Sequence, residues 1–235
     1  MHIDRRTLIG GISLAGLAAA APVRAAQDCP PPNPDWANLG RYAGENAALI
    51  AAKTPVSTVF MGDSITQGWR EQRPAFFEGR AGRGISGQTT PQMVLRMMAD
   101  VVALRPKAVH IMAGTNDIAG NTGPMTTVMT SDNLTAMAAI AKAHGIRVLL
   151  ASVPPADGFP WRPGLPTVPR IREINLWARD YAAKIDAIWV DYTPVLGTPG
   201  GALRPEFAPD GVHPNAAGYA AMESVLSSIL ARLSL

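Results

Sequence analysis

The amino-acid sequence predicts an α/β protein in which a parallel β-sheet carries helices on both faces. Short runs of β-branched and apolar residues alternate with longer amphipathic stretches from residue 56 to residue 235. Such alternation is typical of parallel strands joined by crossover helices. The length of 235 residues suits one domain, and 47% hydrophobic against 17% charged residues allows a sizeable core to be buried.

Five runs are predicted to be strands, and they are Val56–Met61, the weaker Arg83–Ser86, Ala108–Ala113, Arg147–Ser152 and Ala187–Asp191. Helical patterns lie between and after them, at Pro91–Leu104, Thr126–His144, Thr167–Ile185 and Ala216–Leu235. Residues 26–52 form a proline-rich lead-in followed by a first helix at Trp36–Ala52. We therefore expect residues 53–235 to form the domain that contains the sheet.

Residues 1–25 have the organisation of an export signal. Arg5 and Arg6 provide a charged start, Leu8–Ala21 is an apolar run, and Val23–Ala25 offers small residues for cleavage. The apolar run is shorter than the about twenty residues that cross a bilayer comfortably. A membrane anchor or a buried helix at the N-terminus is the alternative, and no later segment is long and apolar enough to cross a membrane.

The route of export stays open. The stretch DRRTLIGG resembles a twin-arginine signal, but Asp4 and Gly10 depart from that pattern, so the general secretory route is the alternative. By either route we expect a protein of the bacterial periplasm or a secreted protein. We expect no stable membrane insertion once the signal is cleaved.

Charge and cysteine content exclude several classes of partner and site. The formal net charge of +3 falls to +1 without residues 1–25, which hold three arginines and one aspartate, so a nucleic-acid partner is not expected. Cys29 is the only cysteine and cannot form an internal disulfide, and Asp28 before it spoils a lipoprotein cleavage site. One cysteine and one loop histidine cannot make a zinc ligand set. We expect no metal and no cofactor.

Polar stretches follow the predicted strands at the sheet edge where ligands of open α/β sheets bind. They are GDS (62–64), SGQTT (86–90), GTND (114–117) and, in the loop before the last helix, DGVHP (210–214). Each stretch alone is also explained without function, as a helix cap in GDS or as a turn in the other three. The functional hypothesis depends on all four lying at one edge.

The four histidines differ in how well they fit the role of a base for a serine nucleophile. His2 leaves with the signal, His110 lies mid-strand where a buried core role is expected, and His144 ends a helix, where it suits the helix dipole. His213 lies in a loop at the appropriate edge. Imidazole is the side chain whose proton affinity suits neutral pH, so His213 is the candidate base.

Ser64 is the candidate nucleophile for this base, and Asp210 is its candidate partner. Asp210 precedes His213 by three residues, so one tight turn brings its carboxylate to the imidazole nitrogen that faces away from the serine. Backbone N–H groups of Ser64 and Gly87 and the side-chain amide of Asn116 would converge on a developing oxyanion. These parts together predict an acyl-transfer site.

The same stretches carry a family resemblance. GDS, RGISGQTT, AGTNDIAGNTG and DGVHP, in this order from about Val56 onward, resemble the SGNH or GDSL-type hydrolases, and the second and third are similar to the platelet-activating-factor acetylhydrolase-like branch. Ile65 stands where the common signature has leucine, which is a conservative change. No G-x-S-x-G motif occurs, which argues against an α/β-hydrolase elbow.

This resemblance implies a three-layer α/β/α flavodoxin-like fold with a five-stranded parallel sheet. It also implies a triad of Ser64, His213 and Asp210 and oxyanion donors from Ser64, Gly87 and Asn116. The implied activity is that of a serine hydrolase acting on carboxylic ester bonds.

The substrate is less constrained by the sequence. Two long loops, 154–166 and 193–214, are expected to form the lip of the site. Four side chains are candidates for substrate contact, although aromatic residues also pack loops together: Trp69, Phe159, Trp161 and Arg162. There is no room for a lid domain, which favours small or accessible esters over long-chain lipids.

We therefore expect an exported serine esterase that hydrolyses short acyl esters, with acetyl esters as first candidates. The alternatives are a carbohydrate O-acetylesterase, a lysophospholipase-type lipid esterase, and a non-catalytic ligand-binding module on the same fold. The expected partner is a small-molecule ester, and the oligomeric state stays open.

Overall fold

The structure of the protein, a computed structural model, describes residues 34–235. The predicted export signal, Cys29 and the first part of the lead-in lie outside the described residues. Residues 35–235 form one compact unit. No helix of residues 34–235 is long and apolar enough to cross a membrane.

The described residues form a five-stranded, all-parallel sheet with the strand order β2-β1-β3-β4-β5. The strands are β1 (Thr58–Gly62), β2 (Ala81–Gly84), β3 (Ala108–Met112), β4 (Arg147–Ala151) and β5 (Ile188–Val190). All five predicted strands are present, with ends that differ by at most two residues from the expected ones. This order is the flavodoxin-like one, in which the chain reverses direction across the sheet between β1 and β3.

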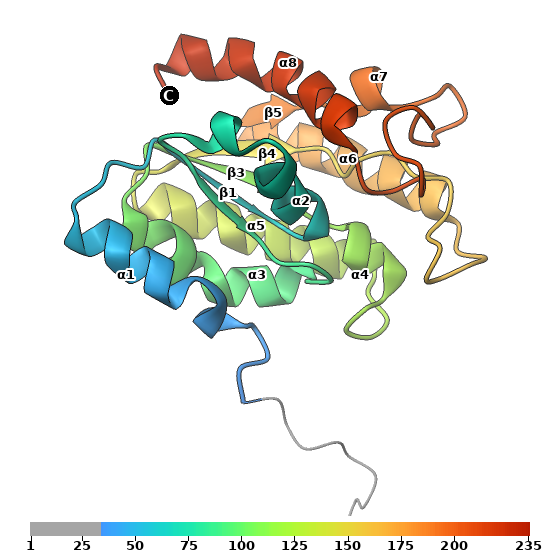
Figure 1. Ribbon diagram of the computed structural model, residues 1–235. Coiled ribbons are helices and arrows are strands. Elements are labelled where there is room, and N and C mark those ends of the chain that lie inside the picture. The colour runs from blue at the N-terminus through green and yellow to red at the C-terminus, as the bar shows by residue number, and fades with distance from the viewer. Residues whose placement is uncertain (1–33) are drawn as a thin grey trace, which may run out of the picture. The chain divides into compact units, whose positions relative to one another are not determined.

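Helices cover both faces of the sheet, as Figure 1 shows for α2 and α8 on one side and α1, α3 and α5 on the other. The helices are α1 (Ala43–Ala51), α2 (Ser64–Gln72), α3 (Thr90–Arg96), α4 (Thr115–Ala119), α5 (Thr127–Ala143), α6 (Thr167–Lys184), α7 (Thr193–Leu196) and α8 (Ala216–Leu233). Shorter 3-10 turns are η1 (Leu39–Tyr42), η2 (Pro74–Phe77) and η4 (Val102–Leu104), and η3 (Met97–Val101) is a π turn. The three-layer α/β/α fold is confirmed.

Helices α2, α4 and α7 were not predicted from the sequence pattern. They are short, and α4 and α7 cover only five and four residues, so an apolar stripe cannot be recognised in them. The predicted helix Pro91–Leu104 is present as α3, η3 and η4 in succession.

The core consists of two apolar clusters, one on each face of the sheet. In β1, Val59 and Met61 belong to the cluster under α3, α5 and α6, while Phe60 between them belongs to the cluster under α2 and α8. Side chains of a strand alternate between faces, and a strand that is buried on both faces is therefore apolar at most positions. This double burial explains why the strands appear in the sequence as continuous apolar runs.

Strand β2 was the weaker prediction because its sequence, Ala-Gly-Arg-Gly, lacks β-branched residues. A Cβ atom on Gly84 would lie 2.2 Å from the backbone nitrogen of Gln67 in α2. Helix α2 therefore packs directly on the backbone of β2, which requires glycine at this position. This contact holds α2, with Ser64 at its first turn, against the carboxyl edge of the sheet.

Candidate active site

The site begins where β1 ends and α2 starts. Asp63 is the N-cap of α2, and its Oδ1 accepts a hydrogen bond from the backbone N–H of Ile65 at 3.0 Å. The capping role therefore falls to Asp63, which leaves the hydroxyl of Ser64 free for another partner. Burial raises the pKa of the Asp63 carboxyl to about 6.

Ser64, His213 and Asp210 are hydrogen-bonded in series. Ser64 Oγ lies 2.9 Å from His213 Nε2, and His213 Nδ1 lies 2.7 Å from Asp210 Oδ2. A proton on Nδ1 that is donated to Asp210 leaves Nε2 as an acceptor for the serine hydroxyl. The arrangement is that of a nucleophile, its base and the group that orients the base.

The turn before α8 orients the carboxylate of Asp210 toward His213. Its Oδ1 accepts hydrogen bonds from the backbone N–H groups of Val212 at 2.9 Å and His213 at 2.8 Å, so the other oxygen faces the imidazole. Partial burial favours the neutral acid, but the hydrogen bonds from His213 and Val212 outweigh it and lower the pKa of Asp210. Asp210 is therefore a carboxylate at neutral pH.

The ends of β2 and β3 flank Ser64 because both strands pair with β1. Gly87, after β2, has a φ of +77°, and its backbone N–H donates no hydrogen bond within residues 34–235. Ser64 is the first residue of α2, where backbone N–H groups have no partner inside the helix. Two backbone donors therefore remain unused at this edge.

Asn116, after β3, is buried and has a defined side-chain orientation. Its Nδ2 donates to the backbone oxygen of Gln88 at 3.0 Å, and its Oδ1 accepts from Asn121 Nδ2 at 2.7 Å. An amide group has two N–H bonds, so one N–H of Asn116 remains available. Ser64, Gly87 and Asn116 thus lie on three neighbouring strand ends, as expected.

The other two described histidines have different surroundings. His110 is buried in β3, its Nε2 lies 2.9 Å from the Tyr192 hydroxyl, and burial lowers its pKa to about 3. His144 follows the last turn of α5. Both occupy the places predicted for them, and among residues 34–235 there is no group of three His, Cys, Asp or Glu side chains that could hold a metal.

Comparison with known proteins places this arrangement in a family. Residues 60–221 match the model of the GDSL-like lipase/acylhydrolase family. The chain belongs to the GDSL-like lipase/acylhydrolase family. The matched residues extend from β1 into α8 and include Ser64, Asp210 and His213. Because members of this family are acylhydrolases, the chain belongs to a family of ester hydrolases.

Solved structures support the same family. A GDSL-like lipase from Bacteroides thetaiotaomicron VPI-5482 is 42% identical, with a TM-score of 0.80 over 84% of this chain and 98% of the other. A protein of Bacteroides fragilis NCTC 9343, classed provisionally as an acylhydrolase, is 39% identical, with a TM-score of 0.78 over 84% and 98%. An acetyl xylan esterase at 22% identity shares the fold, with a TM-score of 0.59 over 74% and 100%.

A search of curated proteins returned no match. The finer placement in the platelet-activating-factor acetylhydrolase-like branch stays a prediction.

Of the four predicted substrate contacts, the prediction for Trp69 is wrong. Trp69 is fully buried between the sheet and α8, with its ring 5.6 Å from Phe60 and stacked 5.9 Å from Tyr219. Its indole nitrogen donates to Glu223 Oε1 at 3.0 Å. The residue lies on the core-facing side of α2, a helix that was not predicted, so the sequence did not show which way it points.

Trp161, by contrast, lies beside the triad of this GDSL-like protein. Its side chain is exposed, and its ring centroid is 6.0 Å from that of His213. Phe159 is buried beneath it, with the two rings stacked at 5.1 Å. Arg162 is exposed and donates to the backbone oxygen of Gly120 at 3.3 Å. The two long loops therefore come together at His213, and of the four candidates it is Trp161 whose ring lies beside the triad.

Asn121 was not recognised from the sequence. Besides its bond to Asn116, its Nδ2 donates to the Gly87 oxygen at 3.3 Å, and its Oδ1 accepts from the indole nitrogen of Trp161 at 3.3 Å. An asparagine beside glycines is ordinary turn chemistry, so the sequence offers no signal that separates this role from a turn.

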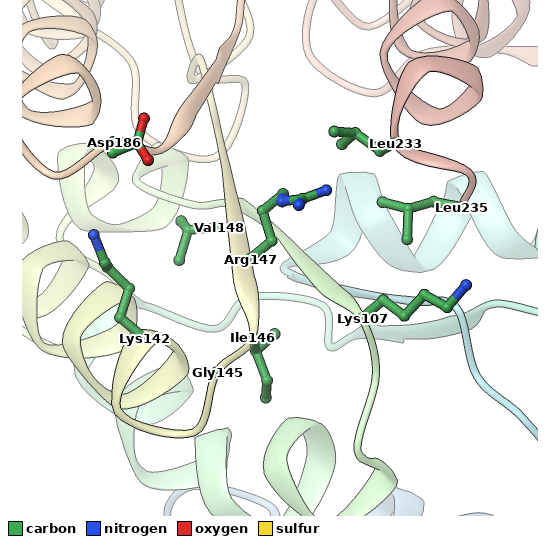
Figure 2. A pocket seen from close by; sticks show the side chains of 9 residues that line it. All are labelled: Lys107, Lys142, Gly145, Ile146, Arg147, Val148, Asp186, Leu233 and Leu235. Atoms are coloured by element: carbon green, nitrogen blue, oxygen red, sulfur yellow. The ribbon is translucent and has the colours of Figure 1, made fainter.

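A hollow lies at the opposite edge of the sheet. It has a volume of about 530 Å³, and Figure 2 shows Lys107, Lys142 and Arg147 around it near the start of β3 and β4. The remaining lining residues are Gly145, Ile146, Val148, Asp186, Leu233 and Leu235. No serine or histidine lines it, so it offers no acyl-transfer chemistry.

Proposed function

We propose that this protein is an exported serine esterase that hydrolyses short acyl esters, with acetyl esters as the first candidates. Ser64 is the nucleophile, His213 the general base, and Asp210 the group that orients the base. The observation that carries the proposal is the hydrogen-bonded series from Ser64 Oγ through both ring nitrogens of His213 to Asp210, at 2.9 and 2.7 Å.

Acylation follows from this series. Ser64 Oγ attacks the ester carbonyl carbon while its proton passes to His213 Nε2. The carbonyl oxygen becomes an oxyanion, and the C–O bond to the alcohol then breaks. The proton on Nε2 moves to the departing alkoxide, which leaves the acyl group on Ser64.

Deacylation repeats the steps with water. Nε2 takes a proton from water as the hydroxide attacks the acyl carbon, and the bond to Ser64 Oγ breaks as the proton returns to the serine. The negative charge of Asp210 stabilises the imidazolium in both halves. The carboxylic acid is released, and the enzyme returns to its starting state.

The oxyanion is stabilised by the N–H groups of Ser64 and Gly87 and the free N–H of Asn116. Two of these are backbone donors without a partner at this edge, and the third has an orientation set by its bonds to Gln88 and Asn121. Donors held in place before the reaction need no reorganisation when charge develops.

Short acyl esters suit an accessible site. The side chains of His213 and Asp210 are 38% and 46% exposed, so the triad is open to solvent and accessible to small esters. The exposed ring of Trp161 is a large apolar surface beside the triad, with its centroid 6.0 Å from that of His213. An acetyl group is small and needs little apolar surface beyond the ring of Trp161.

A carbohydrate O-acetylesterase is the second candidate. The exposed indole of Trp161 beside His213 is a flat surface on which a sugar ring can stack. The similarity of fold to an acetyl xylan esterase points in the same direction. A comparison of kcat/KM for acetylated xylo-oligosaccharides and for a simple aryl acetate separates the two candidates.

A fluorophosphonate that reacts only with activated serines tests the proposal. We expect one covalent adduct, on Ser64 by peptide mass spectrometry, and no adduct in Ser64→Ala. A folded wild-type protein that stays unlabelled and cleaves no aryl ester would instead support the ligand-binding module. Export is tested separately, by the N-terminal sequence of the mature protein in the periplasmic fraction, with cleavage expected near Ala25.

A further inference from the structure

Asn121 lies outside the triad and the three proposed oxyanion donors, yet its side chain contacts both sides of the site. One amide nitrogen donates to Asn116 Oδ1 at 2.7 Å and to the Gly87 oxygen at 3.3 Å. The amide oxygen accepts from the indole nitrogen of Trp161 at 3.3 Å. Both N–H bonds and the oxygen of this amide are therefore in use.

The bonds of Asn116 to Asn121 and to the Gln88 oxygen together set which way the Asn116 amide points. Nδ2 of Asn116 faces the Gln88 oxygen, and Oδ1 faces the amide nitrogen of Asn121. Rotation of the Asn116 amide by 180° would set oxygen against oxygen at Gln88 and nitrogen against nitrogen at Asn121. Asn121 thus acts together with the Gln88 oxygen to select the rotamer that presents an N–H group to an oxyanion.

The backbone keeps Asn121 in register with Asn116. The N–H of Asn121 donates to the Asn116 oxygen at 3.1 Å, and Gly120 between them ends α4 with a φ of +70°. Asn121 itself is exposed, so its side chain contributes little to the apolar core. An exposed side chain whose three polar contacts all lie at the site is better explained by a role there than by stability.

We propose that Asn121 is a positioning residue that acts on the reaction through Asn116, while its oxygen holds Trp161 beside His213. The proposal rests on the proposed esterase function, because it assigns Asn116 an oxyanion. The loss of one hydrogen bond of ordinary strength, about 1 kcal/mol, corresponds to roughly a five- to tenfold effect on rate.

The test is a double-mutant cycle with a short aryl ester as substrate. We expect Asn121→Ala to lower kcat about tenfold with less change in KM, and to melt within a few degrees of wild type. In the Asn116→Ala background no Asn116 amide is left for Asn121 to position, so we expect kcat of the double variant to match Asn116→Ala within about twofold. Asn121→Ser, whose side chain is too short for these contacts, should behave like Asn121→Ala.

Thr122→Ala is the matched control. It changes the next residue of the same loop and removes one hydrogen bond, to Thr89 Oγ1 at 2.9 Å, without touching Asn116. We expect kcat to stay within about twofold of wild type.

Three results would overturn the role of Asn121: kcat of Asn121→Ala within twofold of wild type, an equal loss in Thr122→Ala, or the same fold-loss from Asn121→Ala with and without Asn116. Each of these three results is informative only when the wild type is active and is labelled by the phosphonate. A wild type that is neither labelled nor active would overturn the proposed function as well, so the two failures are distinguishable.

Discussion

Ser64 Oγ and His213 Nε2 lie 2.9 Å apart although 149 positions separate the two residues in the chain. Ser64 is the first residue of α2, just after β1, and His213 lies three residues before the start of α8. The two helices pack on the same face of the sheet, and Tyr219 of α8 donates its hydroxyl to the Ile65 oxygen in the first turn of α2 at 2.9 Å. The contact between Ser64 and His213 is therefore held in place by two helices that pack against each other.

Ser64→Ala should abolish ester hydrolysis and phosphonate labelling with little change in melting temperature. Asp63 caps the helix, so removal of the serine hydroxyl breaks no capping hydrogen bond and should not destabilise the fold. Steady-state kinetics and a thermal melt on the same preparation are sufficient. Activity close to that of wild type would exclude Ser64 as the nucleophile.

Asn116→Ala should lower kcat by about 10² to 10³ with little change in KM, because its N–H bonds an oxygen that is charged only as the tetrahedral intermediate forms. Asn133→Ala is the control. That asparagine also donates through its amide, to Thr90 Oγ1 at 3.1 Å, but belongs to α5. Equal kinetics for both variants would mean that Asn116 is only a turn residue.

The value of kcat/KM should rise from weakly acidic to neutral pH, because His213 must be neutral to accept the serine proton. Asp210, whose pKa is lowered by hydrogen bonds from His213 and Val212, stays ionised across this range and adds no second inflection. The profile should be recorded with a substrate for which chemistry limits the rate. A flat profile would remove His213 as the base.

Asp63→Asn should change how stability depends on pH. Burial raises the pKa of Asp63 to about 6, so between its ordinary value of 3.8 and about 6 the folded state binds more protons than the unfolded state. The free energy of unfolding of the wild type therefore falls as pH rises through this window, by up to about 3 kcal/mol.

The asparagine variant keeps an N-cap oxygen but cannot ionise, so it should lack this loss and become relatively more stable at pH 7.5 than at pH 4. Urea unfolding at both values is the measurement, with the exposed Asp157→Asn as the control. A constant difference between wild type and Asp63→Asn at both pH values would contradict the burial of an ionisable group at this position.

The sequence alone was sufficient for the sheet and for the composition of the site. The strands are buried on both faces and so appear as apolar runs, of which Thr58–Gly62 is one. Parallel strands end at one edge, so GDS, SGQTT and GTND, which follow β1, β2 and β3, were expected to share that edge, and DGVHP was a candidate to join them. Elimination among four histidines then selected His213, which the structure places against Ser64.

Only the tertiary structure decided which way individual side chains point. Trp69 and Trp161 were equal candidates in the sequence, but one is in the core and the other is beside His213. Asn121 is similar: its partners Gly87 and Trp161 belong to other segments of the chain. A sequence pattern records the period of an element and the chemistry of its residues. The direction of a side chain on a short helix or in a loop depends on packing between distant segments, which no local pattern contains.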